Sequence, residues 1–272
     1  MVRIAQFTDV LLTAAQSLSA QLFWPHGVPE WRQRLSLGNG VVALQNGRVA
    51  GTTLWWPHDA AATLGMVIVD QTHRGQGIAA RLVLSALESI GNLPVVLTAT
   101  DMARGGYARL GFEQTGMVDT CRGVPKGSLG QDARIAEVPC DAIMGLDAAA
   151  RGWDRRLLLR SFAAEGAICW GLRERGDLVA YAMDRAMGPG RVIGPLVAPD
   201  VDTAEALVRH CLAAHPGVQL RIDSDPVLGL SDRLPALGLA KASWGTVMVR
   251  GELPLCPDGA PTVFGLASQA FS

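Results

Sequence analysis

The sequence contains one short stretch whose residue types and spacing could bind a phosphate group. The apolar run 67–69 passes into a turn that holds Gly75 and Gly77, and a helical pattern begins at Ile78. Glycine lacks a Cβ atom, so the backbone can turn sharply and its N–H groups can approach a ligand closely. The first N–H groups of a helix have no partner within the helix, and the helix dipole favours a negative charge there. The stretch therefore predicts a strand, an anion cradle and a helix.

The kind of phosphate ligand follows from the pattern of this turn. A dinucleotide-binding fold would show Gly-x-Gly-x-x-Gly, and a nucleoside triphosphatase would show Gly-x-x-x-x-Gly-Lys-Ser/Thr; the stretch contains neither. It contains Arg74-x-x-Gly77-x-Ala79, which resembles the acyl-CoA pyrophosphate loop of GNAT N-acetyltransferases, written Gln/Arg-x-x-Gly-x-Gly/Ala. Segment 107–112 has the pattern Tyr-x-x-Leu-Gly-Phe, which resembles the usual end of the fourth GNAT helix. Both motifs stand in the order and spacing of that family.

The resemblance implies roles for the residues around these motifs. In GNAT proteins a bulge separates the strand before the loop from the next strand, and pantetheine enters the gap; Gly65 marks such a bulge here. The oxyanion donor would be a backbone N–H near Met66 or Val67. Tyr107 would be the general acid, because a phenol with a pKa near 10 stays protonated at neutral pH and can donate to a basic sulfur. The implied cofactor-binding residues are Met66, Val67, Val69, Arg74, Gly75, Gln76, Gly77, Ile78 and Ala79.

Some of these residues also have ordinary structural explanations. Tyr107 could be a half-buried tyrosine whose hydroxyl bonds to the backbone, and Arg74 could be a solvated charge at the start of a helix. Arg81, one turn further along, is expected on a solvated face. The run 61–69 carries no carboxylate where the family usually has a glutamate. The nearest candidates for a general base are His58, Asp59 and His26, although a loop histidine is more often structural or simply exposed.

Regular elements are needed to position these residues. Asn46-Gly47 stands between two apolar runs and is the strongest short-range signal for a hairpin turn. The expected elements are strands at 2–6, 41–45, 48–56, 61–69, 93–99 and 113–118, and helices at 9–18, 29–37, 78–90 and 102–110.

An internal repeat organises the second half of the chain. Three pairs of segments correspond: 43–50 with 171–180, 64–69 with 193–198, and 110–112 with 237–239. The cradle has no counterpart, because residues 199–204 contain no glycine and include two carboxylates that would repel a pyrophosphate. Leu234 stands at the position of Tyr107. The whole chain therefore resembles the tandem GNAT proteins, with a second unit that has lost its CoA site.

Polar residues of the second half would select the acceptor if they faced a cleft. Asp147 and Arg155 fall on a predicted helix at 147–162, and Asp223 ends a predicted strand. The alternative for each of them is a salt-bridged surface. The late segment 263–271 is expected to close against the first half.

Composition excludes some classes of protein. The chain has 272 residues, with 49% hydrophobic and 18% charged, which suits two folded domains. A net charge of -1 gives no electrostatic reason to expect nucleic acid, and no apolar run approaches the roughly 20 residues that span a bilayer. The cysteines lack Cys-x-x-C spacing and the histidines lack metal spacing, so we expect free, buried thiols and no metal. A cytoplasmic protein is predicted.

The sequence thus predicts a mixed α/β fold of two tandem GNAT units, each a twisted, mostly antiparallel sheet flanked by helices. Residues 1–122 form the unit with the acyl-CoA site, 123–130 a linker, and 131–272 the degenerate unit that walls the acceptor site. The implied function is an N-acetyltransferase that carries the acetyl group of acetyl-CoA to the amine of a small-molecule acceptor by direct attack. A non-catalytic module that binds or senses acyl-CoA is the alternative. A pure scaffold is a further alternative, but it leaves Gly75, Gly77 and Tyr107 unexplained together.

Overall fold

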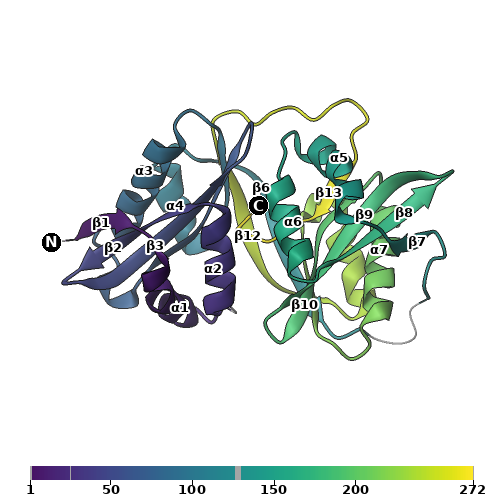
Figure 1. Ribbon diagram of the computed structural model, residues 1–272, viewed down its shortest axis with the longest axis horizontal. Coiled ribbons are helices and arrows are strands. Elements are labelled where there is room, and N and C mark those ends of the chain that lie inside the picture. The colour runs from purple at the N-terminus through teal and green to yellow at the C-terminus, as the bar shows by residue number, and fades with distance from the viewer. Residues whose placement is uncertain (1, 25, 126–129, 272) are drawn as a thin grey trace.

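The computed structural model describes residues 2–24, 26–125 and 130–271, and their strands join into one 13-stranded sheet. Figure 1 shows two lobes side by side, each with strands covered by helices. Most neighbouring strands pair antiparallel, and two pairs, β4 with β5 and β10 with β11, are parallel. The predicted fold class is confirmed.

The first half follows the predicted order of strands and helices. The β2–β3 turn has positive φ at Asn46 and Gly47, 50° and 77°, as the hairpin signal requires. Its elements are β1 (Arg3–Gln6), η1 (Asp9–Leu11), α1 (Leu12–Ala20), α2 (Val28–Leu37), β2 (Asn39–Gln45), β3 (Arg48–Pro57), β4 (Ala62–Val69), η2 (Gln71–His73), α3 (Ile78–Ile90), β5 (Val95–Ala99), α4 (Asp101–Ala108) and β6 (Glu113–Gly123).

The second half repeats this plan with one difference from prediction. The helix expected at 147–162 is two helices, because the chain leaves α5 at Gly152 with a left-handed φ of 78°. The elements are β7 (Ile135–Glu137), α5 (Cys140–Arg151), α6 (Arg156–Ala164), β8 (Ile168–Glu174), β9 (Asp177–Met187), β10 (Gly190–Ala198), α7 (Val201–Ala214), β11 (Leu220–Ser224), η3 (Pro226–Leu228), α8 (Leu230–Arg233), η4 (Leu234–Leu237), β12 (Ala240–Arg250) and β13 (Thr262–Gly265).

The two halves exchange their closing strands. The strand order is β1-β2-β3-β4-β5-β12-β6-β11-β10-β9-β8-β7, so β12 of the second half lies between β5 and β6 of the first. The predicted closing strand 113–118 is therefore part of a longer strand, β6, that pairs with β12 on one side and β11 on the other. Of the predicted linker 123–130, Gly123 ends β6 and residues 126–129 lie outside the described residues. The proposed division of the chain into units does not correspond to two separable sheets.

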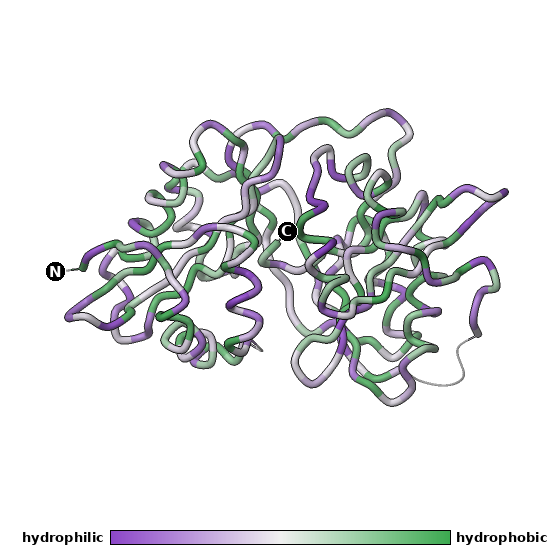
Figure 2. Tube along the Cα trace, viewed as in Figure 1, coloured by the Kyte–Doolittle hydropathy of each residue, from purple (hydrophilic) through white to green (hydrophobic). Residues whose placement is uncertain are grey.

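Each half has its own apolar core, and a further cluster joins them. Helix α3 packs its buried Ile78, Leu82 and Ala86 against β2, β3 and β4. The hairpin tips of β2–β3 and β8–β9, at the two ends of the molecule, are hydrophilic (Figure 2). The joining cluster includes large side chains from both halves: Trp31, Trp56, Met66, Phe162, Tyr181 and Phe271.

Candidate active site

The predicted anion cradle is an exposed turn at the start of α3. Gly75 and Gly77 have φ of 76° and 72°, a left-handed conformation that L side chains rarely adopt. A Cβ atom added to either glycine would meet no heavy atom within 4 Å, so the space in front of the turn is open. Gly77 is the N-cap residue of α3, and the N–H groups of Ile78 and Ala79 lie in the first turn of the helix, where no intrahelical acceptor exists. These features fit a phosphate-binding turn.

The side chains around the turn divide into exposed and anchoring residues. Arg74, Gln76 and Ala79 are exposed, whereas Ile78 is buried in the core and fixes the beginning of the helix. Arg81, expected on a solvated face, is exposed but donates from Nη2 to the carbonyl oxygen of Val2 at 3.0 Å. That bond ties α3 to the first strand.

Asp70, which belongs to neither sequence motif, fixes the chain just before the cradle. Asp70 accepts hydrogen bonds from the backbone N–H of Thr72 at 2.9 Å and from Nε2 of Gln21 at 3.0 Å, and it contacts Nδ1 of His73 at 3.1 Å. The hydroxyl of Thr72 also donates to this carboxylate, and the hydrogen bonds from that hydroxyl and from Gln21 hold the pKa of Asp70 well below its usual range. The sequence signal was present, because an Asp followed two residues later by Thr favours this local turn.

The predicted bulge lies in β4, one residue beyond Gly65. The register of β4 against β3 shifts so that Met66 and Val67 both lie opposite Thr53. Met66 has φ of 54°, and the hydroxyl of Thr52 donates to its carbonyl oxygen at 2.8 Å. In the described chain, β4 pairs with β5 only at its first two residues. The two strands then separate beside the bulge, where the resemblance placed the pantetheine arm. The hydrogen bond by which Thr52 stabilises the bulge was not predicted from the sequence.

Tyr107 lies in α4 and borders the apolar cluster that Val67 and Val69 also border. Its ring packs edge-to-face on Phe112, with centroids 5.7 Å apart. Burial raises the pKa of Tyr107, so its hydroxyl stays protonated through neutral pH. Within the described residues this hydroxyl forms no hydrogen bond, so the alternative of a backbone-bonded tyrosine is not observed.

The equivalent region of the second half is closed by the chain itself. Strand β10 has a register shift against β9 between Ile193 and Leu196, as β4 has against β3. The space between β10 and β11 receives β13, which pairs antiparallel with β10. Helix α7 begins with Asp200, whose carboxylate accepts the N–H of Thr203 at 2.8 Å. A β-strand and a capping carboxylate thus stand where, in the first half, β4 no longer pairs with β5 and the start of the helix is open.

Both halves match known domain models. Residues 16–125 match a model described as an acetyltransferase (GNAT) domain, and residues 143–265 match a second model of the same description. The chain belongs to the GNAT acetyltransferase family. It is a tandem GNAT protein, and acyl transfer is the general reaction of this family.

Similarity to individual GNAT proteins is low in sequence and high in structure. An uncharacterized N-acetyltransferase of Bacillus subtilis, YitH, is 27% identical over 187 residues, which span 66% of each chain and thus just under two thirds of that relative. The crystal structure of an acetyltransferase candidate from Pyrococcus horikoshii has a TM-score of 0.83 at 16% identity, covering 100% of this chain and 96% of that one. A tandem GNAT protein from the clavulanic acid biosynthesis pathway has a TM-score of 0.58 at 14% identity, covering 92% and 98%. These structural similarities establish the fold.

The three candidate bases belong to different surroundings. His58 lies in the turn before β4, where burial and then the charges of Arg155 and Arg151 lower its pKa to about 4. Asp59 accepts the backbone N–H of Asp154 at 2.9 Å and so holds the two halves together. His26 packs edge-on against Trp24, with ring centroids 6.1 Å apart.

The polar residues expected to select the acceptor lie in two different places. Asp147 and Arg155 form a bidentate ion pair at 2.7 and 2.8 Å, with side chains 1% exposed, and Tyr181 donates to the same carboxylate. This pair is not a salt-bridged surface, because both side chains are buried. Asp223 differs, since it accepts from Thr120 at 2.6 Å and from Gln269 at 3.3 Å in the region between the halves.

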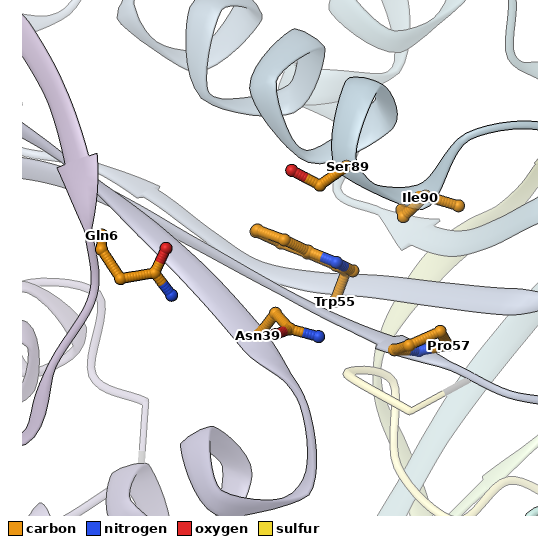
Figure 3. Close-up of a pocket in the computed structure, with 6 residues that line it drawn as sticks. All are labelled: Gln6, Asn39, Trp55, Pro57, Ser89 and Ile90. Carbon is orange, nitrogen blue, oxygen red and sulfur yellow. The ribbon is translucent and has the colours of Figure 1, made fainter.

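Other possible sites are less well formed. A cavity of about 230 Å³ lies at the C-terminal end of α3, opposite to the cradle, and Figure 3 shows Trp55, Ser89 and Ile90 in its lining.

The cysteines are free thiols; Cys256 is exposed and Cys140 partly so, which differs from the expectation of burial. Among the described residues, no group of three His, Cys, Asp or Glu side chains could hold a metal ion. No helix of the described chain is long and apolar enough to cross a membrane.

Proposed function

We propose that this protein transfers the acetyl group of acetyl-CoA to the amine of a small-molecule acceptor. The observation that carries the proposal is the open glycine turn at the start of α3, which lies at the end of a bulged β4 with Tyr107 bordering the same apolar cluster. A phosphate group fits this turn because both glycines are left-handed and nothing fills the space in front of them. Acetyl-CoA would supply an activated thioester.

Each part of the site has a distinct task. The N–H groups of Ile78 and Ala79, with the turn at Gly75 and Gly77, bind the pyrophosphate. The bulge presents backbone N–H groups near Met66 or Val67 to the thioester oxygen, where negative charge develops during attack by the amine. The Tyr107 hydroxyl holds the proton that the departing sulfur receives, and its raised pKa keeps that proton in place.

The second half acts as a wall of the acceptor site. The last described segment runs from β13 into the space between the lobes (Figure 1), where a Cβ atom on Gly65 would come within 2.7 Å of the Ala270 carbonyl oxygen. The ring of Phe271 packs between Trp56, at 4.4 Å, and Phe162, at 5.9 Å. The bulged strand is therefore bordered by residues that the second half supplies, as the predicted closure of segment 263–271 requires.

Thiol release from acetyl-CoA, followed with a thiol reagent across a panel of primary amines, tests this function. We expect amine-dependent release that Tyr107→Phe lowers. CoA binding without turnover on any amine would instead favour the non-catalytic acyl-CoA module. Absence of CoA binding would exclude both.

A further inference from the structure

Two arginines lie between the halves with unused hydrogen-bonding capacity. Arg34 of α2 is 3% exposed, and its Nη1 donates to the carbonyl oxygen of Glu30 at 3.0 Å. Arg185 of β9 is partly buried, and its Nη2 donates to the carbonyl oxygen of Ala267. The Nε atom of each arginine is buried and has no hydrogen-bond partner in the described structure. A buried donor without a partner is costly, so both positions favour an acceptor that the described residues do not provide.

Both guanidinium groups stack on aromatic rings. The central carbon of Arg185 lies 4.2 Å from the ring centroid of Phe162, and that of Arg34 lies 5.6 Å from the ring centroid of Phe271. Stacking uses the flat face of a guanidinium, and its N–H donors point outward along the edge. The edge donors therefore stay available for a planar or tetrahedral anion.

The two positive charges lie close to one another and are not neutralised by contact with an acid. Burial lowers the pKa of Arg34 to about 10, while burial and then the charge of Arg34 lower the pKa of Arg185 to about 9. The acids that act on them are Glu30, Glu165 and Asp223, and in the described chain none forms an ion pair with either arginine. Asp223 is instead paired with Arg221 at 2.9 Å. The region between the halves thus holds two guanidinium groups that no carboxylate contacts within the described chain.

A chain of contacts links Arg34 to the bulged strand β4. The carbonyl oxygen of Arg34 accepts the indole N–H of Trp56 at 2.8 Å, and Trp56 packs on Phe271. The residue before Phe271 lies against Gly65. A group bound by Arg34 would therefore be linked to the bulge through Phe271 and Ala270.

We propose that Arg34 and Arg185 bind an anionic group of the acceptor, so that the substrates are amines that also carry a carboxylate or a phosphate. The inference rests on the proposed transfer to an amine and adds the chemical class of that amine. It also gives the second half a specific task, because α2 supplies one arginine and β9 of the other half supplies the second.

Matched acceptor pairs test the proposal in the full-length protein. Glycyl-phenylalanine and its C-terminal amide share one amine and differ in the carboxylate; phosphoethanolamine and ethanolamine differ in the phosphate. In at least one pair we expect the acidic member to have a kcat/KM higher by about tenfold or more, the scale of a charged hydrogen bond. Arg34→Gln and Arg185→Gln should remove this preference, so that the two members of each pair have similar kcat/KM values. Arg32→Gln, an exposed neighbour on α2, is the matched control and should keep it.

Direct anion binding separates this inference from the proposed function. With the cradle saturated by CoA, sulfate at constant ionic strength should raise the melting temperature of the wild type, and Arg34→Gln should lose that rise. If CoA does not bind, the same comparison is made in a Gly77→Val background, which removes the cradle. Where Arg34→Gln does not fold, Arg34→Lys replaces it and should weaken the sulfate effect, because a point charge replaces the planar fork. Equal kcat/KM within both pairs, together with no sulfate effect, would overturn the proposal. A preference that survives both glutamine variants would also overturn it.

Discussion

Replacing Gly77 by valine separates the strain of the cradle from its ligand-binding role. Gly77 has φ of 72° and ψ of 8°, and an added side chain would point into open space. The direct cost in the free protein is therefore backbone strain, about 1–2 kcal/mol for an L residue in the left-handed region. For a chain of this size that corresponds to a decrease of a few degrees in melting temperature, at about 2–4 °C per kcal/mol. The valine would also occupy the space where phosphate approaches, so the Kd for CoA should rise by about tenfold or more.

Gly229 provides a matched control in the second half. It is the N-cap residue of α8, with φ of 76° and ψ of -5°, and a Cβ atom there would also meet nothing within 4 Å. Gly229→Val should lower the melting temperature by a similar amount and leave CoA affinity unchanged. Calorimetric titration with CoA and thermal melts of both variants give the comparison. The reasoning is refuted if Gly77→Val binds CoA as the wild type does, or if Gly229→Val weakens binding equally.

Three further substitutions test separate parts of the site. Tyr107→Phe should lower kcat by about 100-fold or more, because it removes the proton donor, while CoA affinity changes little; full activity in this variant would exclude the acid role. Asp70→Asn should raise the Kd for CoA by about threefold to tenfold, since the turn before the cradle loses its charged acceptor, and unchanged affinity would show that the brace is dispensable. His58 binds a proton less readily in the folded state, with a pKa of about 4 against 6.5, so its stability contribution is present above pH 6.5 and is lost as the pH falls toward 4. Between pH 6.5 and 4 the free energy of unfolding, measured with denaturant, should fall by about 2 kcal/mol less in His58→Gln than in the wild type, after allowance for partial exposure. An identical pH dependence of the unfolding free energy in the two proteins would contradict this role of His58.

Most elements of the first half could be predicted from local sequence patterns. The hairpin at Asn46-Gly47, the strand with its bulge near Gly65 and the helix after Gly77 each depend on a few consecutive residues, and the structure has them where predicted. The internal repeat also predicted β10 as the strand of the second half that corresponds to β4.

Long-range choices could not be derived in the same way. Strands β6 and β12 follow similar turns, and either could close the strands of either half. Their exchange depends on strand pairings between residues about a hundred or more positions apart. Asp147 and Arg155 were predicted on a single helix, but the break at Gly152 brings their side chains together as a buried ion pair. The proposed anion site between the halves could not be predicted from the sequence, because Arg34 and Arg185 belong to no motif and lie 151 positions apart in the chain.

The number of CoA molecules bound per chain tests the central claim most directly. One open glycine turn lies at the start of α3, whereas in the second half β13 pairs with β10 beside the equivalent bulge and Asp200 caps α7. Calorimetric titration of the full-length protein with CoA should give one site per chain, and Gly77→Val should remove it in the accessible concentration range. Two equivalent sites, or one site that persists with wild-type affinity in Gly77→Val, would contradict the account.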